Sequence, residues 1–164
     1  MAIADIRIHD PLWDDASELR RAEWRTLIVD LLDEAALFEG RPATVLHLEP
    51  SVGETTNVEP AGVMLRTDDP DFHPVEVWDE TLARHFDEYL GTIRQLMDEN
   101  LHPMRREAID MAKKVVHDHA ARRLAERLPD LSSSHEAHRR LFSLLVSLRT
   151  DTTKLPASHR HTLR

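Results

Sequence analysis

Basic and imidazole side chains gather between residues 110 and 123. His117 and His119 lie two positions apart, behind the neighbouring lysines Lys113 and Lys114. Imidazole and ammonium groups can bind an anion, hold a metal ion or transfer protons. On a helix, residues two apart point about 200° apart, so the two histidines cannot bind one ion together. His117 instead continues a polar row with Asp110, Lys113 and Lys114 at spacings of three and four.

This polar row has two interpretations. The ammonium groups, the histidine and the nearby arginines can bind a phosphate or a carboxylate. Alternatively, Asp110 and Lys114 form an ordinary helix pair, worth about 0.2–0.5 kcal/mol, on a solvated face. We favour the solvated face, because charged rows are the default on surface helices. The candidate ligand-binding residues are Asp110, Lys113, Lys114, His117, Arg139 and Arg140.

The sequence "HEAH" at 135–138 is another pattern that could hold a metal ion. His135 and His138 lie three apart, so on a helix they share a face and can share an ion. Zinc proteases instead space two histidines four apart with a glutamate between them. Here no third ligand is evident, and Glu136 is expected to form a capping box with Ser133. The chain has no cysteine, so thiolate metal sites are excluded, and we predict no metal, no cofactor and no catalytic residue.

Charge is divided unevenly along a chain whose net charge is −9. Residues 1–100 contain 8 Lys and Arg against 23 Asp and Glu, whereas residues 101–164 contain 13 against 7. The basic half can bind nucleic acid, or it can complement the acidic half within one domain. We favour complementarity, because Phe142 is the only aromatic residue after position 100 to stack on bases. With four glycines, a phosphate-binding loop or a dinucleotide fingerprint is not expected either.

Strand patterns precede helix patterns in the first half of the chain. Alternation in "IADIRIHD" predicts a strand, and the helical spacing of apolar residues over 17–39 predicts a helix that ends at Gly40. Three more strands are predicted, separated by loop residues such as Gly, Asn and Pro. Their short connections favour antiparallel pairing. These strands cover residues 43–50, 61–67 and 73–78.

Three helices are predicted after residue 78. Asp79 is the expected N-cap of the first, and Pro103 separates it from the second, which spans 104–128. The third begins at the Ser133 capping box and carries a strongly apolar stripe. The apolar stripe of the first helix comprises Leu82, Phe86, Tyr89, Leu90, Ile93 and Met97.

The predicted fold is α+β, with a small antiparallel sheet of about four strands. An N-terminal helix and a C-terminal three-helix bundle pack against this sheet. Residues 1–150 form a single domain of this kind, and residues 151–164 form a flexible tail, because they lack periodicity.

The C-terminal half also resembles a known family. The segments "EAIDMAKKVVHDHAARRLAERL" and "HEAHRRLFSLLVSL" resemble Uncharacterised Protein Family 0262 of the UPF series, a mainly alphaproteobacterial family of unknown function. Together with "IADIRIHD" and "TVLHLEP", the resemblance spans nearly the whole chain. It implies a single bacterial domain, carries over no activity, and draws attention to His117 as a histidine outside the core. The matching residues are Ala108, Ile109, Asp110, Lys113, Lys114, His117, Leu124, Glu126, Arg127, Leu128, Arg139, Arg140, Leu141 and Phe142.

We expect a non-enzymatic binding or regulatory module that acts through protein contacts. Its partner is another protein or a second copy, with a dimer seam along the predicted helix that begins at Asp79 or the predicted helix that begins at Ser133. The alternatives are a small enzyme or anion-binding protein that uses His117, Lys113, Lys114 and Arg140, and nucleic-acid binding by the basic half, which is less expected. No signal peptide and no apolar run of membrane-spanning length occur, so we predict a cytoplasmic protein.

Overall fold

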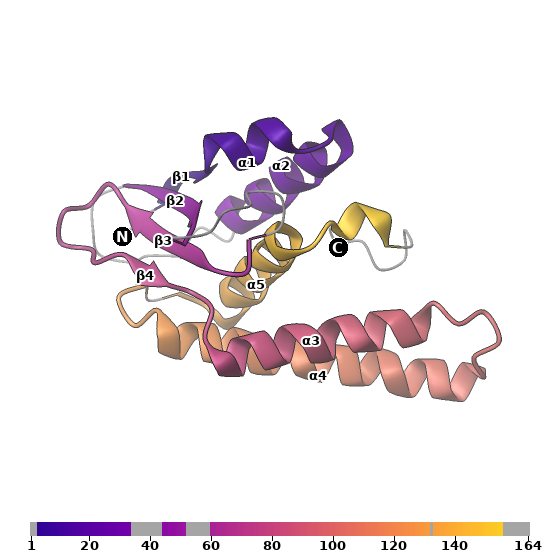
Figure 1. Cartoon of the computed structure of the whole chain (residues 1–164). Coiled ribbons are helices and arrows are strands. Elements are labelled where there is room, and N and C mark those ends of the chain that lie inside the picture. The colour runs from indigo at the N-terminus through magenta and orange to yellow at the C-terminus, as the bar shows by residue number, and fades with distance from the viewer. Residues whose placement is uncertain (1–2, 34–43, 52–59, 132, 156–164) are drawn as a thin grey trace.

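The described part of the chain forms one four-stranded sheet, whose strands alternate apolar and polar residues, and five α-helices (Figure 1). The structure, a computed structural model, describes residues 3–33, 44–51, 60–131 and 133–155. The strands are β1 (Ile3–Ile8), β2 (Thr44–Pro50), β3 (Val63–Thr67) and β4 (Val75–Glu76). The helices are α1 (Asp10–Asp15), α2 (Glu18–Asp33), α3 (Glu80–Leu96), α4 (Pro103–Arg127) and α5 (His135–Arg149), followed by the 3-10 helix η1 (Thr152–Lys154). The predicted α+β class is confirmed.

The sheet is mixed rather than antiparallel. Its strand order is β1-β2-β3-β4; β2, β3 and β4 pair antiparallel, whereas β1 pairs parallel with β2. The prediction of an antiparallel sheet is therefore wrong for β1. The reason is the path of the chain: two helices, α1 and α2, lie between β1 and β2, and a helical crossover brings the next strand back in the same direction.

Two features of the N-terminal region differ from the sequence prediction. The short helix α1 was not predicted; it begins at Asp10 with Pro11 in its first turn, where proline is tolerated, and buries Leu12. Helix α2 confirms the predicted first helix over its described length. The predicted helix end at Gly40 lies outside the described residues.

Helix α5 forms the centre of the core. Ten of its residues are buried, and it packs against α2 on one side and α4 on the other. The ring of Phe142, which is fully buried, lies edge-on to Trp78 and to Tyr89, at centroid distances of 6.4 and 5.8 Å. The predicted strongly apolar helix is thus central, and it connects the sheet layer to the α3–α4 hairpin (Figure 1).

The helix starts after residue 78 are only partly as predicted. Asp79 caps α3, since its Oδ1 accepts a hydrogen bond from the Leu82 N–H at 2.7 Å, and Pro103 opens α4. The capping box of α5 is wrong: Ser134, not Ser133, accepts from the Ala137 N–H, at 3.1 Å. Glu136 then stands at the second helical position, where it does not complete a capping box.

Other expectations concern the exposed end of α3 and the C-terminal segment. The predicted stripe of α3 is buried except for Met97, which is 46% exposed. The predicted tail begins with η1, whose Thr152 is buried and donates to Glu23 Oε1 of α2 at 2.6 Å. Residues 156–164 of that tail lie outside the described residues.

The charge asymmetry contributes to the packing of the two halves. Arg123 of α4 donates to Asp79 at the start of α3, and Arg140 of α5 donates to the Asp30 backbone carbonyl of α2. In both contacts a cation of the basic half lies on the acidic half, as complementarity predicts. No helix in the described part of the chain combines the length and the apolar character that crossing a membrane requires.

Candidate binding groove

The polar row predicted on α4 is internally paired. Lys113 Nζ lies 3.2 Å from Asp110 Oδ1, and Lys114 Nζ lies 3.2 Å from Asp110 Oδ2. Burial raises the pKa of Asp110, but hydrogen bonds from Lys114 and Lys113 outweigh it and hold the pKa below its usual range. Both ammonium groups therefore already have a carboxylate partner within one helix turn.

His117 lies on the inner side of α4 rather than on a solvated face. Its ring centroid is 5.6 Å from that of Tyr89 and 5.4 Å from that of Phe142, and its Nε2 lies 2.9 Å from the backbone carbonyl oxygen of Arg139. A carbonyl oxygen only accepts, so Nε2 carries the proton. Burial lowers the pKa of His117 to about 4, although the hydrogen bond to Arg139 opposes this shift. His117 is thus a neutral, structural donor that joins α4 to α5.

The two predicted arginines point to different neighbours. Arg139 Nη1 lies 3.1 Å from Asp118 Oδ1 on α4, whereas Arg140 Nη1 donates to the Asp30 carbonyl on α2 and its Nε lies 3.3 Å from Glu136 Oε1. The structure therefore brings Arg139 beside His117 but places Arg140 on the α2 side of α5. The predicted anion-binding set does not form one surface.

The predicted metal ligands are engaged in protein contacts. His135 Nε2 lies 3.3 Å from Asp118 Oδ1, and His138 Nδ1 lies 3.0 Å from the Ser134 carbonyl oxygen. His138 is buried, and this burial lowers its pKa. No group of three or more His, Cys, Asp or Glu side chains able to hold a metal ion occurs within the described residues.

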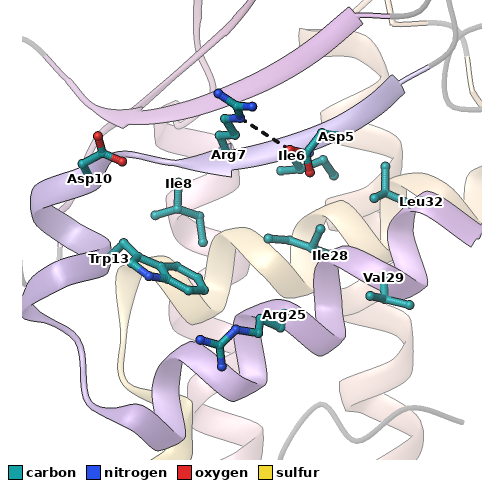
Figure 2. Close-up of a pocket in the computed structure, with 10 residues that line it drawn as sticks. All are labelled: Asp5, Ile6, Arg7, Ile8, Asp10, Trp13, Arg25, Ile28, Val29 and Leu32. Carbon is teal, nitrogen blue, oxygen red and sulfur yellow. Dashed lines mark hydrogen bonds and ion pairs between the residues drawn. The ribbon is translucent and has the colours of Figure 1, made fainter.

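A groove lies at the other end of the molecule, between β1 and the two helices that follow it. Its volume is about 500 Å³, a size typical of ligand pockets. Figure 2 shows Ile8 of β1 and Ile28 of α2 on opposite walls, with the Trp13 ring at one end and Leu32 at the other. The groove is lined by Asp5, Ile6, Arg7, Ile8, Asp10, Trp13, Arg25, Ile28, Val29 and Leu32.

Local sequence explains why these walls are apolar. Trp24, Leu27 and Leu31 of α2 are buried in the core, and the neighbouring arc of the same helix carries Ile28 and Leu32, which are half-buried. The apolar arc of α2 is therefore wider than the core alone requires. Its outer part faces the groove, where Val29 remains 55% exposed.

Charged groups lie around the groove. Asp5 and Arg7 are ion-paired, with 3.4 Å between Oδ2 and Nε, and both are substantially exposed. The guanidinium carbon of Arg25 lies 5.2 Å from the centre of the Trp13 ring, so the aromatic face positions this cation. Arg25 is itself exposed, so its charge is available to a bound group.

The free edge of β1 borders the same groove. Strand β1 is the first strand of the sheet and pairs with β2 alone among the described strands. The His9 N–H donates to the Leu48 carbonyl of β2 at 2.9 Å. Backbone groups of successive strand residues alternate in direction, so those of Ile8 and Ile6 point to the free edge. Consistently, the Ile6 N–H donates to its neighbour's side chain, Asp5 Oδ1, at 2.9 Å rather than to a strand.

None of the groove residues was a candidate site residue from sequence. A usable signal existed in α2, where Ile28, Val29 and Leu32 extend the apolar arc beyond the core-facing stripe. What sequence could not provide was the position of β1 at the sheet edge, because that depends on its parallel pairing with β2.

The fold and the groove together define an α+β protein with a mixed four-stranded sheet and an open groove at one sheet edge. Over residues 82–151, the chain matches the sequence model of the Uncharacterised protein family (UPF0262). The match covers most of α3, and all of α4 and α5, and confirms the predicted resemblance there; the N-terminal segments of that prediction, which include β1, lie outside it. No curated protein and no solved structure matches the chain.

Proposed function

We propose that this protein is a binding module that takes up an extended segment of a partner protein as an additional strand beside β1. The observation that carries this proposal is the coincidence of a strand edge that pairs with no other described strand and an apolar groove on the same edge. In this mode of recognition, backbone hydrogen bonds supply affinity, and pockets for alternate side chains supply specificity. A cytoplasmic location and a bacterial source remain predictions from the sequence.

The groove defines the kind of segment that fits. In an added strand every second side chain points to the same face, so residues at alternate positions enter the space between β1 and α2. These residues are apolar, because Ile8, Ile28 and Leu32 form the walls. An acidic residue near the Trp13 end pairs with Arg25.

Asp5 has a defined part in this mechanism. Its carboxylate accepts the Ile6 N–H, which otherwise is an open donor of the edge strand. Proteins commonly protect edge strands with charged residues, since unprotected edges pair with other chains. A carbonyl oxygen of the incoming strand takes over the hydrogen bond from the Ile6 N–H and displaces the Asp5 carboxylate. Asp5 therefore disfavours unspecific strand pairing, but a segment that also fills the groove can still bind.

The sequence alternatives have less support from the geometry. Anion binding requires the α4 lysines and Arg140 to converge, yet both lysines are paired with Asp110, and Arg140 contacts α2. We therefore base the function on the groove.

Selection from a library of random peptides long enough to span β1 tests the proposal. We expect enrichment of peptides with alternating apolar residues and one acidic residue. Binding of these peptides should shift the amide resonances of Ile6 and Ile8. The substitution Val29→Glu, on the groove wall, should weaken binding by about tenfold or more.

Leu19→Glu is the matched control, because Leu19 is an equally exposed apolar residue of α2 that does not line the groove. It should leave peptide affinity unchanged. The proposal is wrong if no peptide is enriched, or if the enriched peptides bind Val29→Glu and Leu19→Glu equally well.

A further inference from the structure

Helix α4 carries a second apolar face, on the side away from the core. Along this face Met104, Ala108, Met111 and Val115 recur at spacings of four, three and four residues, which keeps them on one side of a helix. All four are exposed, and the exposed fractions of the three larger side chains are 76% for Met104, 56% for Met111 and 48% for Val115. We call these four residues the outer stripe.

The outer stripe lies opposite the side of α4 that packs into the protein. Ile109, Ala120 and Leu124 are buried on the inner side, against α3 and α5. Successive helix residues are rotated by about 100°, so the outer stripe points about 180° away from these three buried residues around the axis of α4. Figure 1 shows α3 and α4 side by side, on the side of the molecule away from α1 and α2. The described part of the chain therefore leaves the outer stripe to solvent, whereas aligned exposed apolar residues usually mark a contact surface.

We propose that a second copy of this chain covers the outer stripe, with the two α4 helices packed antiparallel. Alternating spacings of three and four are those of a helix–helix seam in which apolar side chains interdigitate. A two-fold axis through the seam places the same stripe on both helices, so that one apolar surface covers the other.

Charged residues beside the stripe determine the antiparallel direction. Glu107 and Lys114 lie on the same flank of the outer stripe, seven residues apart. In an antiparallel pair, equal flanks face each other and run in opposite directions. A two-fold axis beside Met111 therefore places Glu107 of each copy opposite Lys114 of the other, which forms two ion pairs across the seam. Lys114 keeps its pairing with Asp110 of its own helix, because an ammonium group has three N–H donors and can serve both carboxylates.

The remaining positions are compatible with this register. Met111 of one copy lies beside Met111 of the other, and Met104 lies near Val115. On the opposite flank Ala112 lies next to the axis, and Arg105 and His119 lie seven residues to either side of it. A parallel pair instead places Glu107 beside Ala112 and forms no such ion pair, which is why the charges favour the antiparallel arrangement.

The stripe contains only four residues, so the dimer is expected to depend on protein concentration. The chain has a mass of 18.9 kDa, and light scattering after gel filtration should show the mass rising towards twice this value as concentration increases. Met111→Glu should abolish this increase, because it adds one carboxylate from each copy beside the two Glu107 carboxylates and adds no cation. Leu19→Glu, an exposed apolar residue of α2, should leave the increase unchanged.

Charge reversal separates this arrangement from other contacts of α4. Glu107→Lys places a lysine of each copy opposite Lys114 of the other copy. This like-charge contact should weaken the dimerisation affinity by about tenfold or more. Lys114→Glu should weaken it similarly, and the double variant Glu107→Lys with Lys114→Glu should restore wild-type affinity.

Three results would overturn the proposal: a monomer at every concentration, a dimer that Met111→Glu does not affect, or a double variant as weak as the single ones. Circular dichroism would show that each variant is folded, which we expect because the substituted side chains are exposed. The outer stripe is separate from the groove at β1, so this test and the peptide selection can fail independently.

Discussion

Helices α3 and α4 lie side by side, yet they distribute their apolar residues differently (Figure 1). In α3, the large apolar side chains lie on one side, where residues such as Leu82 and Ile93 are fully buried. In α4, Leu124 is fully buried on the inner side, whereas Met111 and Val115 are about half exposed on the outer side. One helix is amphipathic in the usual sense, and the other is apolar on two opposite sides.

This difference shows what helical spacing can and cannot indicate. For α3, the spacing identified both the helix and its buried side. For α4, the apolar residues from Ala108 to Leu128 identified a helix but not its orientation, because two sets of residues each have helical spacing. The neighbours α3 and α5 determine which set is buried.

The largest expected effect compares the two sides of α4. Leu124→Ala removes a fully buried side chain and should lower the free energy of unfolding by about 2–5 kcal/mol. Met111→Ala, on the outer stripe, should change it by about 0.5 kcal/mol or less. Urea unfolding at a protein concentration low enough to keep the chain monomeric measures both. Equal costs would contradict the assignment of an inner and an outer side.

The next effect concerns His117, on the inner side of α4. Its pKa is about 4 in the folded protein and close to 6.5 in the unfolded chain, so the unfolded chain binds more protons between these values. Stability should therefore fall as the pH falls from about 6.5 to about 4, by up to about 3 kcal/mol. His117→Gln does not titrate, and its amide can still donate to the Arg139 carbonyl.

In unfolding experiments across this pH range, His117→Gln should lose less stability than the wild type. Part of the dependence should remain, because burial also lowers the pKa of His138. His119→Gln is the control: His119 is exposed on the same helix, so this variant should follow the wild type. A wild-type pH dependence in His117→Gln would show that His117 is not buried as a neutral donor.

Much of the fold was predictable because local rules set it. The alternation in β1, the Asp79 cap and the Pro103 helix start depend on neighbouring residues, and the structure confirms all three. The parallel pairing of β1 was not predictable in this way, since it depends on the path of the chain through α1 and α2. The predicted N-cap of α5, Ser133, is one residue away from the observed N-cap, Ser134. Serine is a good N-cap residue at either position, so the sequence alone does not distinguish them.

The site was less predictable than the fold. His117 belongs to the polar row by spacing, but it lies on the inner side of α4, where its ring contacts Tyr89 and Phe142. The groove combines one strand with two helices, so no single segment contains its pattern. Polar side chains that can do chemistry stand out in the sequence, whereas the groove consists mainly of apolar walls and backbone groups.

Asp79 connects α3 to α4, so it tests how far the two helices depend on each other. Its Oδ1 caps α3 and its Oδ2 accepts from Arg123 Nε of α4 at 3.0 Å. Asp79→Ala removes both contacts and should cost about 2 kcal/mol, at the upper end of the range for caps. Asp79→Asn keeps the cap but loses the ion pair, and should cost about half as much. Thermal unfolding of both variants gives the two contributions; equal losses would mean that the cap itself contributes little.

The smallest expected effect concerns the intrinsic helix propensity of α3 and α4. Gly91 lies within α3, and a Cβ added there meets no heavy atom within 4 Å. Gly91→Ala should therefore stabilise the protein by about 0.5–1 kcal/mol. Ala112→Gly, at an exposed position of α4, should destabilise it by a similar amount, measured by urea unfolding of the monomer. The two substitutions are reciprocal, so helix propensity alone predicts a gain in stability at residue 91 and an equal loss at residue 112. A gain at 91 without the loss at 112 would show that the added methyl group makes new contacts on α3.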